Sequence, residues 1–337
     1  MTQQNAHQQR RLKDTQGLLF IHQFGWLRTA ELGKLLWPGM ATARQSADRL
    51  ARSWIERRLV LSRQLPDGAG RALVLAAAGV ELLAREGIAA NSGKDIGKTT
   101  GTQWQPPMTW RHDLIAHGVL CELHMRGFIV YPEAELRRSE TRLTKIPDGL
   151  AVKGSEVFWL EVENARKTGK AMRTLAQALA IVSNGHALAV RGFKPSAALV
   201  AYVPSALDER GHTISHKQRV GSAVAKATKS DLTLHWAECQ LLGTTGVGTV
   251  TFSTERIASD RAGSVLKVLE SSGWQKDDDD VLSVSYAGNR AFIWQDDEGH
   301  WSFSIETMAG KPITGNYASN ISEAKREAAS ELASLAL

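Results

Sequence analysis

The sequence predicts a multidomain α/β protein with a helical N-terminal domain ending in a β-hairpin, a central α/β domain, and a small C-terminal α+β domain. A chain of 337 residues is long enough for two or three separate cores. Apolar segments with helical period alternate with short β-rich runs along the chain. Stretches rich in Gly, Ser, Thr and Pro interrupt this pattern near residues 89–110 and 243–254, and they predict domain boundaries there.

The N-terminal domain, residues 10–88, is predicted to contain three helices, a hairpin and a fourth helix. Thr29 and Thr42 are placed to cap the second and third helices, and Pro38-Gly39 ends the second. The turn "PDGAG" joins two β-rich runs. This order of elements is typical of a winged helix-turn-helix. The predicted helices cover 15–27, 30–37, 43–58 and 77–86, and the predicted strands cover 59–65 and 71–76.

In a winged helix-turn-helix the third helix enters the major groove of DNA, and the hairpin contacts phosphates. Double-stranded DNA is therefore the expected partner, although solvated arginines or a protein-binding winged helix would look the same in the sequence. The outward face of the third helix would present Arg44, Gln45, Asp48, Arg49 and Arg52, and the hairpin would present Arg63, Gly68 and Arg71.

The charge is distributed unevenly. Residues 1–110 carry 15 Lys and Arg against 8 Asp and Glu, residues 111–250 carry 18 against 13, and residues 251–337 carry 8 against 14. A polyanion would be attracted to the first two segments and repelled by the last. The pattern is what a DNA-binding protein with an acidic appendage would show, and an ordinary solvated basic surface explains the charge equally well.

Residues 89–110 are predicted to be a linker, and residues 111–242 to form the central domain. Its elements follow in the order α-β-β-β-α-β-α-β. The predicted helices cover 111–127, 168–185 and 216–228, and the predicted strands cover 128–136, the hairpin around 148–163, 197–204 and 232–239.

Acidic residues gather in the hairpin "KIPDGLAVKGSEVFWLEVENARK", residues 145–167. Strand alternation over 157–163 places Glu161 and Glu163 on one face, and a hairpin turned at "VKGSE" would bring Asp148 beside Glu161. Three carboxylates are the hard oxygen ligands that Mg²⁺ or Mn²⁺ prefers. Lys167 or Arg166 could then neutralise a phosphate. A surface hairpin with charged edges is the alternative.

The "PDG" at 147–149 and the "EVE" at 161–163, on a hairpin flanked by helices, resemble the core of the PD-(D/E)XK nucleases. With the N-terminal winged helix and the "RHDL" at 111–114, residues 10–240 resemble the replication-relaxation family and the related plasmid-mobilisation relaxases. The resemblance implies that Asp148 and Glu161 are metal ligands. It also implies a lysine two residues after Glu161, where this chain has Glu163, so that Lys167 would have to replace that lysine.

Other residues are candidates for the same site. A glutamate on the first helix is often a ligand in this fold, so the resemblance makes Glu122 a further candidate, and with Glu163 it completes the expected metal set of Asp148, Glu161, Glu163 and Glu122. The expected catalytic set is Asp148, Glu161, Glu163 and Lys167. His112 could cap the helix, pack or act as a base, and Gln177 is either a site residue or an ordinary polar helix residue.

These observations predict a DNA-binding, Mg²⁺- or Mn²⁺-dependent protein of a mobile element that nicks one strand at a transfer or replication origin, together with conjugation or replication machinery. The alternative is a catalytically inactive accessory factor or transcriptional or replication regulator with the same fold. A restriction-type endonuclease is a third reading and would need a homodimer. None of the four tyrosines lies in a cluster of histidines, which argues against a tyrosine-type relaxase.

The remaining features narrow the class of protein. No run of about 18 apolar residues is present, and the polar N-terminus lacks the apolar core of a signal peptide, so a cytoplasmic protein without a membrane partner is expected. Cys121 and Cys239 are too few for a disulfide framework. Residues 255–337 are predicted to form an α+β domain, whose role the sequence does not indicate.

Overall fold

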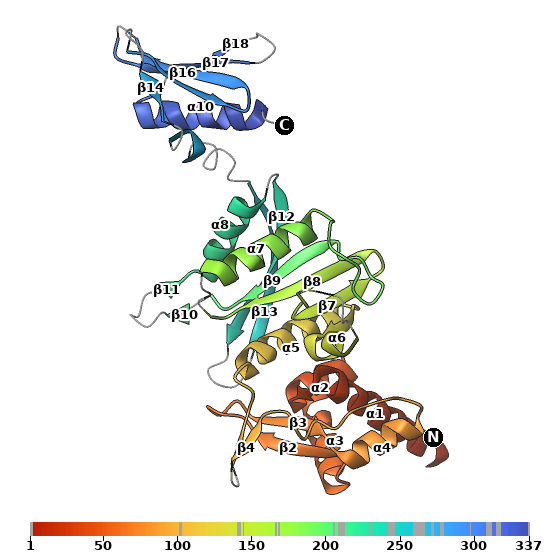
Figure 1. Ribbon diagram of the computed structural model, residues 1–337. Coiled ribbons are helices and arrows are strands. Elements are labelled where there is room, and N and C mark those ends of the chain that lie inside the picture. The colour runs from red at the N-terminus through yellow and green to blue at the C-terminus, as the bar shows by residue number, and fades with distance from the viewer. Residues whose placement is uncertain are drawn as a thin grey trace. The chain divides into compact units, whose positions relative to one another are not determined.

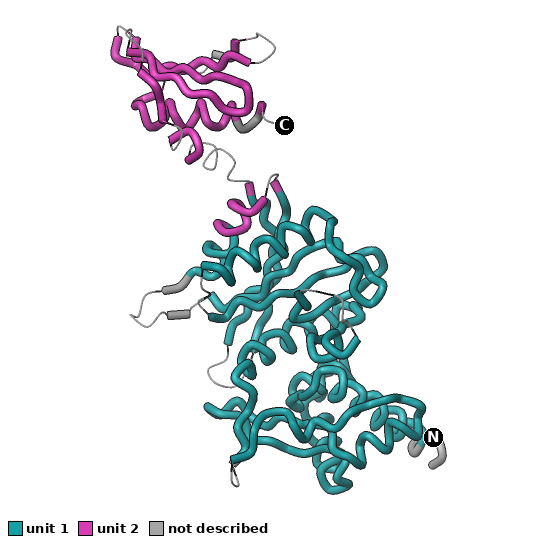
Figure 2. The backbone as a smooth tube through the Cα atoms, in the orientation of Figure 1, with its two compact units in different colours: residues 1–221, 232–257 teal, residues 222–231, 258–337 magenta. Residues whose placement is uncertain are grey.

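The structure, a computed structural model, is a mixed α/β protein, as the sequence predicts. It divides into two compact units, residues 1–221 with 232–257 and residues 222–231 with 258–337 (Figure 2). The residues described are 3–100, 103–139, 143, 145–165, 167, 169–204, 206–207, 213–228, 231–241, 247–258, 267–270, 273–276, 280–296, 298–307, 312–314 and 318–335.

The N-terminal segment contains the helices and hairpin in the predicted order, together with a two-residue strand that completes a sheet of order β1-β3-β2. Thr29 is the first residue of its helix and Arg28 is the cap, whereas Thr42 does flank the third helix. Neither cap position makes a side-chain capping hydrogen bond. The elements are α1 (Gln3–Phe24), β1 (Trp26–Leu27), α2 (Thr29–Leu36), α3 (Ala43–Glu56), β2 (Val60–Gln64), β3 (Arg71–Leu75) and α4 (Ala77–Arg85).

The central segment is a six-stranded sheet of order β13-β12-β9-β8-β7-β6 (Figure 1). Strands β8, β9 and β12 are parallel, and the other neighbours are antiparallel. The elements are α5 (Trp110–Met125), β6 (Ile129–Pro132), α6 (Glu133–Ser139), β7 (Gly149–Lys153), β8 (Glu156–Glu163), α7 (Gly169–Ser183), β9 (Ala197–Tyr202), β10 (Ala206–Leu207), β11 (Thr213–Ile214), α8 (His216–Ala227), β12 (Leu232–Leu241) and β13 (Val247–Ile257).

Helix α5 and strand β8 bury their apolar faces against each other. Phe158, Leu160 and Val162 belong to the same buried cluster as Ile115 and Val119 of α5. Strand alternation therefore turns Trp159, Glu161 and Glu163 toward the opposite face, on which Figure 1 shows α7. The hairpin β7–β8 is thus held between two helical layers, with Glu161 and Glu163 on the side away from α5.

The N-terminal helices and the central sheet share one hydrophobic core. Leu18 and Leu32, from α1 and α2, lie in the same buried cluster as Val119 and Leu160. The predicted linker is also structured, because it contains the antiparallel strands β4 (Lys98–Thr100) and β5 (Gln103–Gln105). Residues 89–110, predicted to be a linker between two domains, therefore contain a strand pair, and the segments on either side of them contribute to one buried cluster.

Two predicted elements differ from those observed. The strand predicted over 128–136 ends at Pro132, and Glu133–Ser139 form α6 instead. The boundary predicted near 243–254 falls largely on β13, which pairs antiparallel with β12 as an edge strand of the central sheet. The central sheet therefore extends to Ile257 rather than ending near residue 242.

The second unit contains a five-stranded antiparallel sheet and a long helix, in line with the predicted α+β arrangement. Its core includes Ile293, Phe303 and Ile305 of the sheet with Ala328 and Leu332 of the helix. No helix among the described residues is long and apolar enough to cross a membrane. The elements are β14 (Gln275–Lys276), β15 (Leu282–Tyr286), β16 (Asn289–Gln295), β17 (Trp301–Glu306), β18 (Pro312–Thr314) and α10 (Ile321–Leu335).

Candidate functional site

Asp148 lies directly before β7, and its carboxylate is bonded to the main chain of the neighbouring strand β8. Its Oδ2 accepts a hydrogen bond from the Val162 N–H at 2.7 Å and lies 3.1 Å from His112 Nε2. Burial alone would raise the pKa of Asp148, but the bonds from His112 and Val162 and the charge of His112 hold that pKa below its usual value. Asp148 is therefore an ionised, fixed carboxylate.

Glu161 is almost fully buried on the face of β8 turned away from α5. Its Oε2 accepts from Lys145 Nζ at 2.7 Å, and its Oε1 accepts from Trp159 Nε1 at 2.7 Å. Burial, and next the Asp148 carboxylate, raise the pKa of Glu161 to about 7. The site thus holds an acid that can exchange its proton near neutral pH.

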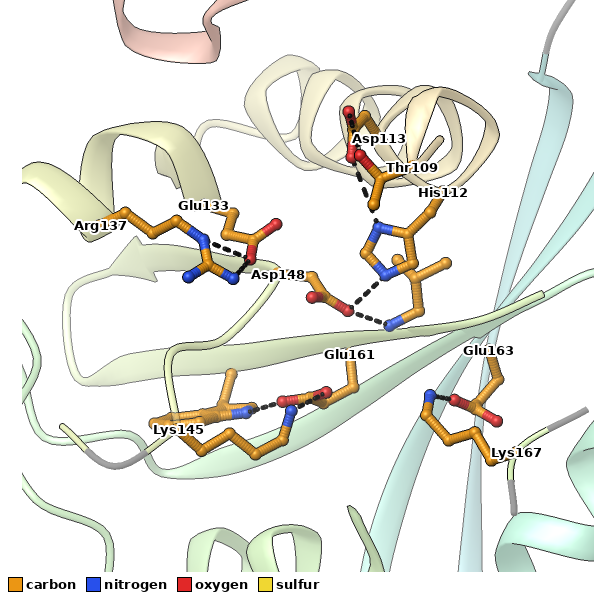
Figure 3. Close-up of polar contacts among 12 residues, drawn as sticks. Thr109, His112, Asp113, Glu133, Arg137, Lys145, Asp148, Glu161, Glu163 and Lys167 are labelled. Carbon is orange, nitrogen blue, oxygen red and sulfur yellow. Dashed lines mark hydrogen bonds and ion pairs between the residues drawn. The ribbon is translucent and has the colours of Figure 1, made fainter. Parts of the chain in front are cut away.

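Glu163 and Lys167 form a second acid–lysine pair at the end of β8. Glu163 is completely buried and is ion-paired to Lys167. Burial lowers the pKa of Lys167, while the charges of Glu161 and Asp148 act in the opposite direction. Figure 3 shows Glu161 and Glu163 each pointing toward a lysine. Arg166, the alternative to Lys167, lies outside the described residues.

His112, at the start of α5, lies between two carboxylates. Burial would lower its pKa, but Asp113 and Asp148 outweigh burial and raise the pKa to about 10. Glu133, the first residue of α6, faces the same place and is bonded to Arg137 (Figure 3). Sequence analysis missed Glu133 as a candidate because it assigned this segment to a strand.

Glu122 and Gln177, two further residues that the sequence pointed to, have different surroundings. Glu122 lies 3.7 Å from Lys34 and 3.9 Å from Arg126, about 15 Å along α5 from His112 at 1.5 Å of rise per residue. It is therefore paired on another part of the helix. Gln177 is exposed on α7, whereas its neighbours Leu175 and Ala176 are buried.

A cleft of about 690 Å³ lies between α2, α3 and the β2–β3 hairpin. Arg44, Arg52 and Arg71 line it, and all three are exposed. Arg44 and Arg71 form no ion pair within the part of the chain that the structure describes. Gln45 and Arg49 are exposed on the adjoining strip of α3. The cleft is thus a basic surface at the position predicted for DNA contact.

Arg63 does not share that surface. It pairs with Ala72 across the hairpin, while the neighbouring pair Gln64–Arg71 and the pair Ser62–Leu73 face the cleft side. Since side chains alternate along a strand, Arg63 lies on the other face of the hairpin, and its Nε is buried. Arg63 and Arg71, predicted together as DNA contacts, therefore lie on different faces of the hairpin.

No protein-family model, curated protein or solved structure matches the chain.

Proposed function

We propose that this protein binds double-stranded DNA and nicks it with the help of a divalent metal, in the manner of a relaxase at a transfer or replication origin of a mobile element. The observation that carries the proposal is the β7–β8 hairpin, which holds Asp148 and Glu161 beside Lys145. An acid and a cation held together in this way are suited to phosphodiester hydrolysis.

The arrangement of the elements supports the two fold assignments behind this proposal. Three antiparallel strands β6, β7 and β8 are followed by α7 and the parallel strand β9, and Asp148 and Glu161 occupy the start of the second strand and the body of the third. This is the arrangement that the resemblance to PD-(D/E)XK nucleases implies. Likewise, α1–α3, the hairpin and α4 follow the winged-helix order.

The donors at the hairpin fit a hard divalent cation such as Mg²⁺ or Mn²⁺. Glu161 has a raised pKa because it is buried beside the Asp148 carboxylate, and a cation shared by the two acids would relieve their repulsion. When bound, such an ion would activate water and stabilise charge on the phosphate. Lys145 and Lys167 stand where they can neutralise that phosphate.

The basic cleft supports DNA binding by the N-terminal segment. The residues lining it include five cations and two acids, and Arg44 and Arg52 on α3 are exposed beside Arg71 of the hairpin. Arginines at these positions can bind phosphates or the base edges of the major groove. Conjugation or replication proteins and a second copy of the chain remain proposed partners on this view.

A second candidate function is a DNA-binding accessory factor or regulator without nuclease activity. The observation that favours it is that Glu161 and Glu163 are each already neutralised by a lysine. Position 163, where the resemblance implies the lysine of the nuclease, is an acid. In this case the lysines would replace the metal instead of assisting it.

The test is conversion of supercoiled plasmid, carrying the DNA that flanks the gene, to open circles with Mg²⁺, Mn²⁺ or EDTA. Wild type is expected to nick with metal, Glu161→Gln to lose nicking, and Glu156→Gln, an exposed acid on the same strand, to retain it. Sequence-specific binding without nicking would favour the regulator. If the wild type neither nicks nor binds this DNA, both proposed functions are overturned.

A further inference from the structure

A pocket of about 200 Å³ has Asp148 in its wall. Phe24 and Trp26 from the N-terminal segment form part of its apolar wall. Three carboxyl residues, Asp113, Glu133 and Asp148, line the same pocket together with Arg137. Since a water molecule takes up about 30 Å³ in the liquid, the pocket has room for a cation with several waters.

His112, Glu133 and Asp148 are close enough to bind one ion. One ligand atom from each lies within 4.8 Å of the others, and among the described residues this is the group of acids and histidines that meets that criterion. The three come from the start of α5, the start of α6 and the residue before β7. Glu161 is not part of the group, so the site shares only Asp148 with the Asp148–Glu161 pair of the hairpin.

A second observation, independent of the acids, points to a ligand in the pocket. His117 lines it, is 5% exposed, and has a buried Nδ1 without a hydrogen-bond partner in the described part of the chain. Phe24 and Trp26 pack edge-on against its ring and fix its orientation. Since buried polar atoms normally have a partner, His117 is suited to bond a water held by a cation.

The existing contacts leave ligand atoms available. Glu133 uses Oε1 for Arg137, and Asp148 uses Oδ2 for Val162 and His112, so each carboxylate has a second oxygen for a cation. A proton on His112 competes with a metal ion at this place, because His112 Nε2 already lies 3.1 Å from Asp148 Oδ2. A cation would take the place of that proton.

We propose that His112, Glu133 and Asp148 bind a divalent transition-metal ion, with His117 bonding one of its waters. An imidazole beside two carboxylates favours Mn²⁺ or Zn²⁺ over Mg²⁺, which prefers oxygen ligands alone. The inference is linked to the proposed function only through Asp148, which belongs to both proposed sites. Ion binding here does not require that the protein nick DNA.

The test uses the full chain and Mn²⁺, whose free form gives an electron paramagnetic resonance signal that is lost on binding. Wild type is expected to bind Mn²⁺, with Zn²⁺ competing more strongly than Mg²⁺. His112→Ala and Glu133→Gln should each weaken binding about tenfold or more. The matched control is Glu135→Gln, on the same helix but paired with Arg191, and it should bind as wild type does.

Glu161→Gln separates this site from the hairpin. Retained Mn²⁺ binding in Glu161→Gln, with loss in Glu133→Gln, would support the proposal, and the reverse would overturn it. Absence of binding in the wild type would overturn it as well. If Mn²⁺ fails to bind while plasmid nicking still depends on Glu161, the inference fails and the proposed function stands. Glu133 is 24% exposed, and circular dichroism would verify that Glu133→Gln folds as wild type does.

Discussion

Replacing Glu161 by Gln should stabilise the metal-free protein in a pH-dependent way. The folded state raises the pKa of this acid from 4.5 to about 7, chiefly because it is buried. The folded protein therefore holds a proton that the unfolded chain has lost, and stability falls as the pH rises from 4.5 to 7. At 1.36 kcal/mol for each unit of pKa, ionised Glu161 costs about 3 kcal/mol.

The glutamine removes this cost, because it has no proton to lose. It can still accept from Trp159, and Lys145, with 31% of its side chain exposed, can turn to water. Urea unfolding in EDTA, followed by tryptophan fluorescence, should show the variant gaining about 2 kcal/mol over wild type between pH 5 and pH 8. The exposed control Glu156→Gln should show no such gain. A difference between Glu161→Gln and wild type that is the same at both pH values would refute the reasoning.

Two further predictions test other parts of the molecule. Arg44→Ala and Arg71→Ala should each weaken DNA binding and reduce the salt dependence of the affinity by about one unit of slope, whereas Arg63→Ala should change neither, as fluorescence anisotropy across a salt series would measure. Gly118→Val should lower stability by about 1 to 3 kcal/mol, since even a Cβ there would lie 2.8 Å from Val247 Cβ. A thermal melt would measure this loss of stability. Val247→Ala should restore part of it, whereas a loss caused by helix propensity alone would not be restored.

Sequence reasoning located the acidic hairpin because its pattern is local. Alternation along 157–163 fixes the shared face of Glu161 and Glu163, and "PDG" places Asp148 at the start of the preceding strand. The lysine partners were harder to predict from the sequence. The path of the chain before β7 decides which of several lysines reaches Glu161. Lys145 lay within the quoted stretch and was not singled out.

The misses have identifiable causes. For α6, Pro132 precedes two acids in the first turn and two arginines in the last, which are helix signals that the β-rich run before them obscured. For β13, glycines and threonines were taken as a boundary, although threonine is common in strands. Burial of Arg63's face could not be inferred, since it depends on residues that the sequence assigned to a linker.

The shared core of the N-terminal helices and the central sheet has a geometric consequence. The cleft lined by Arg44 and Arg71 and the carboxylates of the β7–β8 hairpin belong to one compact unit, so the fold fixes the distance between them. Under the proposed function, this distance would separate the DNA sequence bound from the phosphate cleaved. Lengthening the β4–β5 turn would leave that separation unchanged. Exchanging α1–α4 for another segment would remove apolar side chains that share a buried cluster with α5. Under the proposed function, a change of DNA target would therefore have to be made on the surface of α3.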